Sequence, residues 1–382
     1  MKKLVLIDSN AIIHRAYHAL PANLSNSKGE PTNVTYGFAL ALIKILEEIK
    51  PDYIAAAFDL AGPTFRHIEY KEYKAKRVKA PQELYDQIPR VKEMLSVFGV
   101  PIYAVAGFEA DDVIGTIVEQ CKDGDTMVYI ASGDRDVYQL LNGHVRVLML
   151  HRGFSEAEIF DHDHLREKYN LDPEDFIDLK ALMGDASDNI PGVPGIGPKT
   201  ATDLIQKFDT LEKLYVALDC HSEPIRQAQG KLREESSGVS DAVAKGDLDP
   251  SATPQDDSGK RLSDTYIKET SKRLGIKERI VRLLCQHENQ AFQSKMLATI
   301  RRDVPIEFDL AKARWGQYDK DKVRRLFEEL EFKSLLRRFS KDYEEAEGPR
   351  PVLSGVEGPK AEDEKKITEE QKKKDEQLKL EL

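Results

Sequence analysis

The sequence predicts an α/β fold, in which a parallel sheet is covered on both faces by helices and is followed by an α-helical region. Over about the first 150 residues, short apolar runs alternate with longer amphipathic runs, as in strands joined by crossover helices. The apolar runs Leu-Val-Leu-Ile, Ile-Ala-Ala-Ala-Phe and Met-Val-Tyr-Ile-Ala are continuous, which is typical of strands buried on both faces. From about Leu171 the strand pattern stops and only helical patterns follow.

The expected elements follow from this alternation in chain order. Pro51 ends the second helix, and Pro89 is expected to kink or split the third because proline lacks a backbone N–H. The expected strands are Lys3–Ile7, Tyr53–Phe58, Pro101–Val105, Thr126–Ala131 and Val145–Leu150. The expected helices are Asn10–Leu20, Thr32–Lys50, Pro81–Phe98 and Ala110–Lys122, and then Pro173–Met183, Thr200–Phe208, Ile276–Gln286 and Lys320–Arg338.

Composition divides the chain into two domains and a tail. Residues 1–170 are expected to form the α/β domain, and residues 171–340 a helical subdomain with a Gly/Pro-rich turn and helix at 190–208. Within the subdomain, residues 220–263 are polar and rich in Ser, Asp, Gln and Gly, so we expect a loosely ordered or disordered insertion. Residues 341–382 hold 13 acids and 9 bases with few apolar anchors, which predicts a solvated tail.

The overall composition excludes several classes of protein. The chain has 382 residues, and no apolar run approaches the ~18–20 residues of a membrane span. Three distant cysteines, Cys121, Cys220 and Cys285, exclude a disulfide framework and a CxxC zinc site and favour a reducing, cytoplasmic setting. The net charge of −10 argues against nucleic-acid binding, but the stretch 66–79 contains six bases and two acids.

Acidic residues follow four successive predicted strands. Because ligands of an open parallel sheet bind beyond the carboxyl ends of the strands, we expect these acids to meet in one crevice. A fifth group, with two acids three residues apart, lies in the sequence Gly-Asp-Ala-Ser-Asp-Asn after the fifth strand. The whole set is Asp8, Asp59, Glu109, Asp111, Asp112, Asp134, Asp136, Asp185 and Asp188.

Such a crowd of carboxylates predicts a site for divalent cations. Like charges a few Å apart raise each other's pKa, and oxygen ligands without His or Cys select Mg²⁺ or Mn²⁺. Two such ions are a common device for phosphodiester cleavage. For a single acid, such as Asp134, a helix N-cap is the simpler interpretation. A phosphatase of the haloacid-dehalogenase type would need an Asp-x-Asp pair, whereas this chain has Asp8-Ser9-Asn10.

Two segments indicate contact with nucleic acid. Glycines at 192, 195 and 197 precede a helix near Pro198, so the backbone can turn tightly and the helix N–H groups can meet a phosphate. This is a helix–hairpin–helix pattern. In the basic stretch 66–79, Tyr70 and Tyr73 could stack on unpaired bases. The side chains of His14, Tyr17 and His18 could face the crevice mouth, although ordinary packing explains Tyr17 and His18 about equally well.

Together these motifs resemble the 5′-nuclease domain of bacterial DNA polymerase I and, more broadly, the flap-endonuclease family. The resemblance covers residues 1–219 and 275–340. It is carried by Ile7-Asp8-Ser9-Asn10, Arg15-Ala16-Tyr17-His18, Phe58-Asp59, Thr64-Phe65-Arg66-His67, Tyr73-Lys74-Ala75, Phe108-Glu109-Ala110-Asp111-Asp112, Ser132-Gly133-Asp134-Arg135-Asp136, Gly184-Asp185-Ala186-Ser187-Asp188-Asn189, Pro191-Gly192-Val193-Pro194-Gly195-Ile196-Gly197 and Thr299-Ile300-Arg301-Arg302-Asp303-Val304-Pro305.

The resemblance implies a PIN-like α/β core, a helical arch and a helix–three-turn–helix, with two-metal (Mg²⁺) hydrolysis at DNA flaps, nicks or gaps. It implies that the first metal is held by Asp8, Asp59, Glu109 and Asp111, the second by Asp134, Asp136 and Asp188, with Asp112 and Asp185 nearby. Arg66 and Lys74 would grip the scissile phosphate. The DNA-binding residues would be His14, Tyr17, Tyr73, Arg77, Gly192, Gly195, Ile196, Gly197, Lys199 and Thr200, and backbone carbonyls of Leu182, Met183, Pro191, Val193 and Ile196 would bind K⁺.

The sequence departs from the family at His14, where the family often has Tyr, and at the insertion 220–263. Because only a charged tail follows residue 340, we expect a stand-alone 5′→3′ exonuclease and flap endonuclease, with any polymerase on a separate chain. Two alternatives remain open at this point. One is a PIN-type ribonuclease, and the other is a catalytically silent protein that binds DNA junctions.

Overall fold

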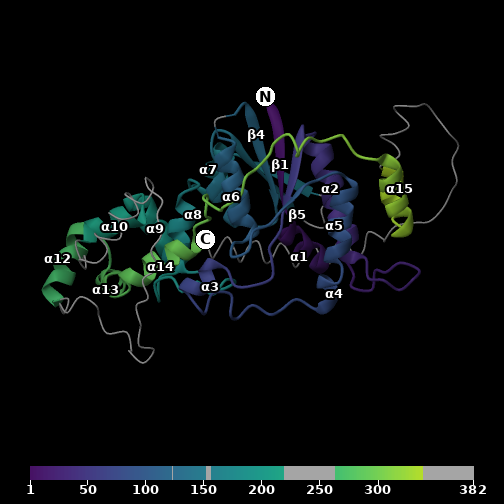
Figure 1. Ribbon diagram of the computed structural model, residues 1–382. Coiled ribbons are helices and arrows are strands. Elements are labelled where there is room, and N and C mark those ends of the chain that lie inside the picture. The colour runs from purple at the N-terminus through teal and green to yellow at the C-terminus, as the bar shows by residue number, and fades with distance from the viewer. Residues whose placement is uncertain (123, 152–155, 219–262, 339–382) are drawn as a thin grey trace. The chain divides into compact units, whose positions relative to one another are not determined.

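The computed structural model describes residues 1–122, 124–151, 156–218 and 263–338 (Figure 1). The chain forms two compact units, and their bounds differ from a single helical subdomain over 171–340. The first unit takes up the chain again after residue 297, a return that composition alone does not signal. Except for Ser263, the predicted insertion lies outside the described residues, as does the predicted tail. Among the described residues, the first unit comprises Met1–Ile177, Ser187–Asn189 and 298–338, and the second comprises Asp178–Ala186, 190–218 and 263–297.

The first unit is built on a six-stranded sheet with the order β3-β2-β1-β4-β5-β6. The first five strands are parallel to their neighbours, and β6 is antiparallel to β5. All five predicted strands are confirmed, whereas β6 was not predicted because its sequence, Glu-Ala-Glu-Ile-Phe, is half polar. The strands are β1 (Lys2–Asp8), β2 (Tyr53–Ala57), β3 (Ile102–Tyr103), β4 (Thr126–Ser132), β5 (Val145–His151) and β6 (Glu156–Phe160).

Helices cover both faces of this sheet, as predicted. Val5 and Ile7 of β1 pack against one group of helices, and Leu4 and Leu6 pack against another. Because successive side chains of a strand point to opposite faces, burial on both faces explains the continuous apolar run. Figure 1 shows α2 and α5 on one side of β1 and α6 on the other. The first group is α1 (Ser9–Ala19), α2 (Asn33–Ile49) and α5 (Ile88–Val97), and the second is α6 (Ala110–Gln120) with the 3-10 helix η1 (Arg135–Leu140).

The predicted helix at Pro81–Phe98 is split in two, as its proline suggested. Helix α4 spans Gln82–Tyr85, and Pro89 lies in the first turn of α5, where a missing N–H costs no intrahelical bond. The remaining helices of the first unit are α3 (Phe65–Glu69), α7 (His162–Tyr169) and α15 (Lys320–Glu329). The apolar residues of α15 join the core around α5.

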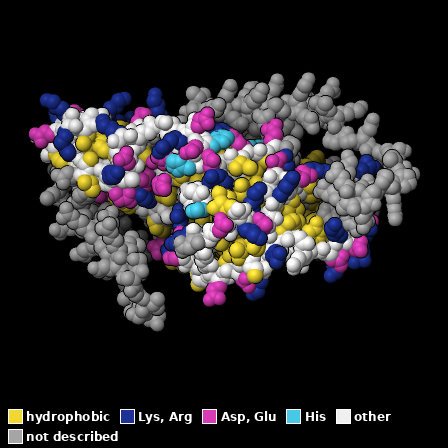
Figure 2. Space-filling view, turned by 90° about the horizontal axis from the view of Figure 1, so that it is seen from above, with side chains coloured by type: hydrophobic (Ala, Val, Ile, Leu, Met, Phe, Trp, Pro, Cys, Tyr) yellow, Lys and Arg dark blue, Asp and Glu magenta, His cyan; other side chains and the backbone are white. Residues whose placement is uncertain are grey.

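Acidic and basic side chains are interspersed on the face shown in Figure 2.

The second unit is helical, and a close backbone crossing shapes its hairpin. Gly184 and Gly192 both have positive φ, and a Cβ on Gly192 would lie 2.2 Å from the backbone nitrogen of Gly184. Gly192 therefore serves the protein's own packing. No helix of the described ranges has the length and apolarity of a membrane span. The helices are α8 (Asp175–Met183), which begins in the first unit, α9 (Pro198–Phe208), α10 (Leu211–Leu218), α12 (Asp264–Leu274), α13 (Glu278–Gln286) and α14 (Glu288–Ala298).

Candidate active site at the carboxyl edge of the sheet

The strand-end acids of the first unit line one open pocket of about 100 Å³. The sheet order reverses between β1 and β4, and open α/β sheets bind ligands beyond the carboxyl ends of the strands at such a point. The predicted convergence is confirmed for six acids. These are Asp8, Asp59, Glu109, Asp111, Asp134 and Asp136; the lining also contains Asn10, His14, Lys74 and Arg77.

Asp8 is held by two hydrogen bonds at the end of β1. One of its carboxylate oxygens accepts a hydrogen bond from the hydroxyl of Ser132 at 2.7 Å, and the other accepts one from the backbone N–H of Ala11 at 3.1 Å. Burial raises the pKa of Asp8 to about 7 against these bonds, and the charges of Asp134 and Asp59 act in the same direction. Added positive charge in the pocket would therefore favour the ionised carboxylate.

Asp59 ties the loop after β2 to the start of α6. Its backbone N–H donates to the side-chain oxygen of Asn10, and its carboxylate accepts the backbone N–H of Ala110 at 2.6 Å. Desolvation raises the pKa of Asp59, and the charge of Glu109 adds to that effect. Hydrogen bonds from the backbone N–H groups of Asp59 and Ala110 thus connect the ends of β1 and β2 to the start of α6.

Helix capping and the pocket use the same acids. Asp8 caps α1, Glu109 caps α6 and Asp134 caps η1. Asp134 accepts from the backbone N–H of Asp136, and the N–H of Asp134 donates to the hydroxyl of Ser132. The capping interpretation of a single acid is therefore correct, and it does not exclude a place in the pocket.

The α6 side of the pocket carries its own positive charge. The ammonium group of Lys74 lies 2.8 Å from a carboxylate oxygen of Glu109 and 3.6 Å from one of Asp188. Burial acts to raise the pKa of Glu109, but Lys74 and Arg66 lower it below its usual value. Burial raises the pKa of Asp111 well above its usual value, against the charge of Arg66.

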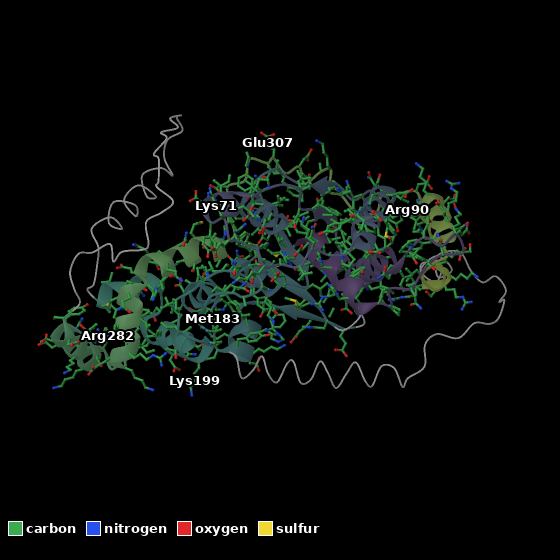
Figure 3. All side chains as sticks on the ribbon, turned by 90° about the horizontal axis from the view of Figure 1, so that it is seen from below. Lys71, Arg90, Met183, Lys199, Arg282 and Glu307 are labelled. Atoms are coloured by element: carbon green, nitrogen blue, oxygen red, sulfur yellow. The ribbon has the colours of Figure 1, made fainter. Side chains whose placement is uncertain are left out.

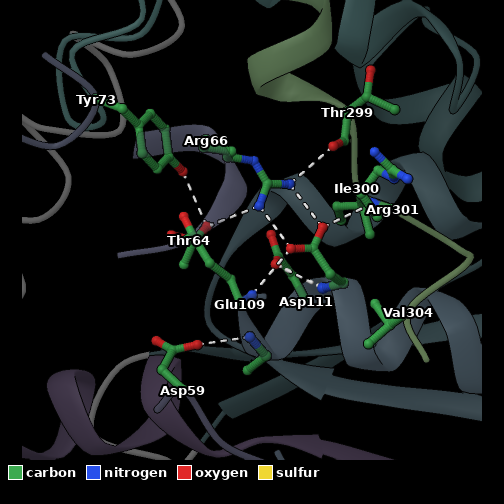
Figure 4. Close-up of polar contacts among 12 residues, drawn as sticks. Asp59, Thr64, Arg66, Tyr73, Glu109, Asp111, Thr299, Ile300, Arg301 and Val304 are labelled. Atoms are coloured by element: carbon green, nitrogen blue, oxygen red, sulfur yellow. Dashed lines mark hydrogen bonds and ion pairs between the residues drawn. The ribbon is translucent and has the colours of Figure 1, made fainter. Parts of the chain in front are cut away.

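Arg66 and Tyr73 lie inside the first unit, which differs from their predicted contact with DNA. Arg66 is 1% exposed, and its guanidinium binds Asp112 and Glu109 (Figure 4). Tyr73 is 3% exposed, and its hydroxyl donates to Glu109 at 3.0 Å and to Asp188 at 3.3 Å. Both side chains are committed to internal carboxylates, so neither reaches a phosphate or a base in this conformation.

The donor chemistry of the pocket fits hard divalent cations. Its six carboxylates offer oxygen donors only, and burial holds the pKa of Asp8 and Asp111 above the usual values. Such groups are stabilised in their ionised form by a cation. Within the described ranges, no three His, Cys, Asp or Glu side chains are arranged to enclose an ion. Cation binding would therefore require these carboxylates to move closer together.

Two sequence models match this chain in succession. Residues 3–170 match the model described as "5'-3' exonuclease, N-terminal resolvase-like domain", and residues 171–244 match "5'-3' exonuclease, C-terminal SAM fold". The two matches cover more than half of the chain. The chain belongs to the 5′-3′ exonuclease family. DNA polymerase I of Bacillus subtilis is 38% identical over 346 residues, which are 91% of this chain and 33% of that protein. The chain thus spans about a third of the length of such relatives.

Solved structures of other proteins share the fold of this chain. The T5 5′-exonuclease with bound divalent metal ions (zinc) is 20% identical, with a TM-score of 0.50 over 90% of this chain and 99% of that one. A flap endonuclease of bacteriophage T5, in a pseudo-enzyme-product complex with DNA and metal ions, is 19% identical, with a TM-score of 0.51 over 90% and 98% of the two chains. The predicted PIN-like core and helical subdomain agree with these folds.

The hairpin residues from Ile190 onward belong to the second unit. Lys199 at the start of α9 is exposed (Figure 3), as are Gly195 and Gly197. The carbonyl of Leu182 accepts the N–H of Val193 at 2.7 Å. The remaining residues predicted there are Met183, Pro191, Gly192, Ile196 and Thr200, and the carbonyl of Gly192 accepts a side-chain N–H of Gln290. Their predicted roles toward DNA and K⁺ stay predictions.

The other predicted residues have mixed surroundings. Asp188 belongs to the first unit and pairs with Lys74, whereas Asp185 belongs to the second unit and pairs with Lys180 at 2.6 Å. His14 lines the pocket. Tyr17 packs against the core of the first unit, so the packing interpretation describes its position.

Two residues at the pocket were not predicted, namely Ser132 and Asn10. Ser132 is fully buried and bridges the loops that carry Asp8 and Asp134. Asn10 lines the pocket and holds the backbone of Asp59. Their signal in the sequence was position, because each lies two residues from a strand-end acid.

Proposed function

We propose that this chain is a Mg²⁺-dependent 5′→3′ exonuclease and structure-specific flap endonuclease that hydrolyses DNA phosphodiesters. The observation that carries this proposal is the gathering of acids from four strand ends around one pocket at the β1–β4 reversal. Membership of the 5′-3′ exonuclease family and the metal ions named for the T5 structures support it.

The pocket residues divide between two proposed metal positions. Asp8, Asp59, Glu109 and Asp111 would hold the first ion, since all four line the pocket and the last three meet at the start of α6. When bound, divalent ions lower the pKa of water and stabilise negative charge on phosphate oxygens. Mn²⁺ has the same oxygen preference and would substitute. The second ion would be held by Asp134, Asp136 and Asp188, all of which belong to the first unit.

The basic wall of the pocket would orient the phosphate. Lys74 and Arg77 line the same pocket as the acids. Burial acts to lower the pKa of Lys74, but the charges of Glu109 and Asp188 together raise it above its usual value, so its ammonium stays charged at neutral pH. His14 lines the pocket as well and could meet the terminal nucleotide. We keep Lys74 as a phosphate-positioning residue and Arg77 and His14 as DNA contacts, but not Arg66 or Tyr73.

The second unit would bind duplex DNA through its hairpin. The exposed glycines and Lys199 at the hairpin offer backbone N–H groups and a positive charge to a phosphate, and K⁺ at the hairpin carbonyls would support that contact. We also propose 5′ flaps, nicks and gapped duplexes as substrates, a polymerase as the partner in replication and repair, and a cytoplasmic location, which the scarcity of cysteines favours.

The test is cleavage of a labelled 5′-flap DNA by the full chain, with Mg²⁺ and with EDTA. We expect Mg²⁺-dependent release of the flap, and no cleavage of a sequence-matched RNA strand. Preferential cleavage of the RNA would identify a PIN-type ribonuclease. Binding of the flap without cleavage at any Mg²⁺ or Mn²⁺ concentration would identify a junction-binding protein and overturn the proposal.

A further inference from the structure

Asp112 differs from the pocket acids although it follows Asp111 directly. It is 0% exposed, and four donors surround its carboxylate. One oxygen accepts from Arg66 at 2.7 Å and from the backbone N–H of Glu109 at 3.1 Å; the other accepts from Arg66 at 2.8 Å and from the backbone N–H of Arg301 at 2.8 Å. A carboxylate has about four acceptor positions. Those of Asp112 are filled by the protein itself.

Arg66 is equally enclosed. Its two terminal nitrogens grip Asp112 as a fork, which is the strongest geometry of an arginine–carboxylate pair. One nitrogen also contacts Glu109 at 3.3 Å, and the other donates to the backbone carbonyl of Thr299 at 2.9 Å (Figure 4). The guanidinium lies 4.6 Å from the ring centre of Phe65. One side chain thus joins α3, α6 and a segment more than 200 positions further along the chain.

That segment, residues 298–304, is called the return segment here because the chain re-enters the first unit through it. Gln139 of η1 binds it twice, donating to the carbonyl of Ala298 at 3.1 Å and accepting the N–H of Ile300 at 2.9 Å. Gln139 is itself buried. The return segment is therefore fixed to η1, which begins after the pocket acid Asp134 and contains the pocket acid Asp136.

The return segment is also fixed along α6. The N–H of Val304 donates to the hydroxyl of Thr116 at 3.0 Å. A Cβ on Gly115 would lie 2.7 Å from a methyl carbon of Ile300 and 2.8 Å from the carbonyl oxygen of Arg301, so only glycine allows this approach. The helices α6 and η1, which both carry pocket residues, are thus both bonded to the backbone of the return segment.

We propose that Arg66 and Asp112 are positioning residues, which hold Glu109 and Asp111 in place by fixing the start of α6 to the return segment. Neither residue touches a metal ion or the substrate. The inference rests on the proposed function for what the pocket binds. It replaces the predicted roles of Asp112 beside the metals and of Arg66 at the scissile phosphate.

The test measures Mn²⁺ binding to the full chain by electron paramagnetic resonance of the free ion, so that no activity is needed. The variants are Asp112→Asn, Arg66→Lys, their double variant, and Asp111→Asn as a proposed direct ligand. We expect Asp111→Asn to lose one of two bound ions. Asp112→Asn and Arg66→Lys should keep both ions with affinity weakened by about 10–100-fold, as for other residues that orient ligands. The double variant should be little weaker than the weaker single variant.

A matched control separates positioning from general destabilisation. Asp178 of the second unit is 3% exposed and pairs with Lys295 at 2.6 Å, so Asp178→Asn also breaks a buried ion pair. We expect this control to lower Tm without changing Mn²⁺ affinity. The inference is overturned if the control weakens Mn²⁺ binding as much, if Asp112→Asn loses one bound ion, or if both single variants bind like the wild type.

Failure of this inference is distinguishable from failure of the proposed function. If the wild type cleaves flaps and the Asp112 and Arg66 variants bind Mn²⁺ normally, only the positioning roles are wrong. If the wild type neither binds Mn²⁺ nor cleaves flaps, both proposals fall together.

Discussion

Asp8 and Glu109 both cap a helix at the same edge of the sheet, but their surroundings have opposite effects. Asp8 is bonded by a hydroxyl and a backbone N–H, and burial raises its pKa to about 7. Glu109 pairs with Lys74 and Arg66, which lower its pKa despite burial. The β1 side of the pocket is thus stabilised by added positive charge, whereas the α6 side contains positive charge already.

This difference shows that acids gathered at one edge of a sheet need not all have the same role. Where a base is built in, as with Arg66 and Asp112, the pair organises the protein. Where burial dominates, as at Asp8, the ionised carboxylate depends on charge from outside. The predictions below test this division of the acids, starting with the largest effect.

The largest effect is expected for Asp134→Ala on the β1–β4 side. Loss of a residue that orients a metal ligand lowers activity by up to about 100-fold. Removing a proposed metal ligand itself should reduce flap cleavage by more than this, while DNA binding stays measurable. Cleavage rates and a gel-shift assay measure both. Asp163→Asn, at a fully exposed acid of α7, is the matched control and should cleave normally. Wild-type turnover in Asp134→Ala would remove this acid from the metal site.

On the α6 side, Arg66→Met should strongly destabilise the fold. The substitution leaves Asp112 buried and unpaired, and breaking a buried pair in this way costs about 3–5 kcal/mol. The side chains of the pair are 2% and 0% exposed, so solvent does not compensate. Urea unfolding measures the loss. A cost below that of an exposed pair, such as Lys213 with Asp209, would show that the pair is not needed for stability.

The raised pKa of Asp8 predicts a pH dependence of stability in metal-free protein. The folded state holds the proton up to about pH 7, whereas the unfolded chain releases it near pH 4. Stability contributed by Asp8 is therefore complete below about pH 4 and falls by up to about 4 kcal/mol as the pH rises to about 7.

Urea unfolding at pH 5 and pH 8 in EDTA measures this effect, with Asp8→Asn as the reference. The stability of the wild type relative to Asp8→Asn should fall between the two pH values, and Mg²⁺ should restore it at pH 8. A difference that does not change with pH would mean that Asp8 is not strained in the empty pocket.

The smallest of these effects is expected for Ser132→Ala, at the residue that joins the two acidic loops. The variant removes a hydrogen bond to a carboxylate and the acceptor of the Asp134 N–H, which should cost about 1.5 kcal/mol. Flap cleavage should fall by less than in Asp134→Ala. Thermal unfolding and cleavage rates measure both, and Ser132→Thr, which keeps the hydroxyl, should restore part of the loss.

The sequence predicted the open side of the pocket well because strand ends are local signals. Asp8, Asp59 and Asp134 each follow an apolar run, and the geometry of a parallel sheet brings them together. The sequence did not separate Asp111 from Asp112. Adjacent helical residues point about 100° apart, so only one of the two could face the pocket. The sequence did not show which one, because it gave no sign that Arg66 would enclose Asp112.

The partners that enclose Arg66 and Asp112 are distant in the chain, since Asp112 lies 46 positions from Arg66 and Thr299 lies 233 positions from it. In the sequence, Arg66 simply opens a basic stretch. At the hairpin, too, the contact partner could not be predicted from the sequence. Its glycines predicted a close backbone approach, and at Gly192 that approach is made by the chain itself at Gly184.

The central claim is that the strand-end carboxylates form one site for two divalent cations. Counting the Mn²⁺ ions bound by the wild-type chain, with Asp134→Ala beside it, tests this most directly. The account predicts two ions for the wild type and one for Asp134→Ala. Wild-type protein that binds no Mn²⁺, or a variant that still binds two ions, would contradict it.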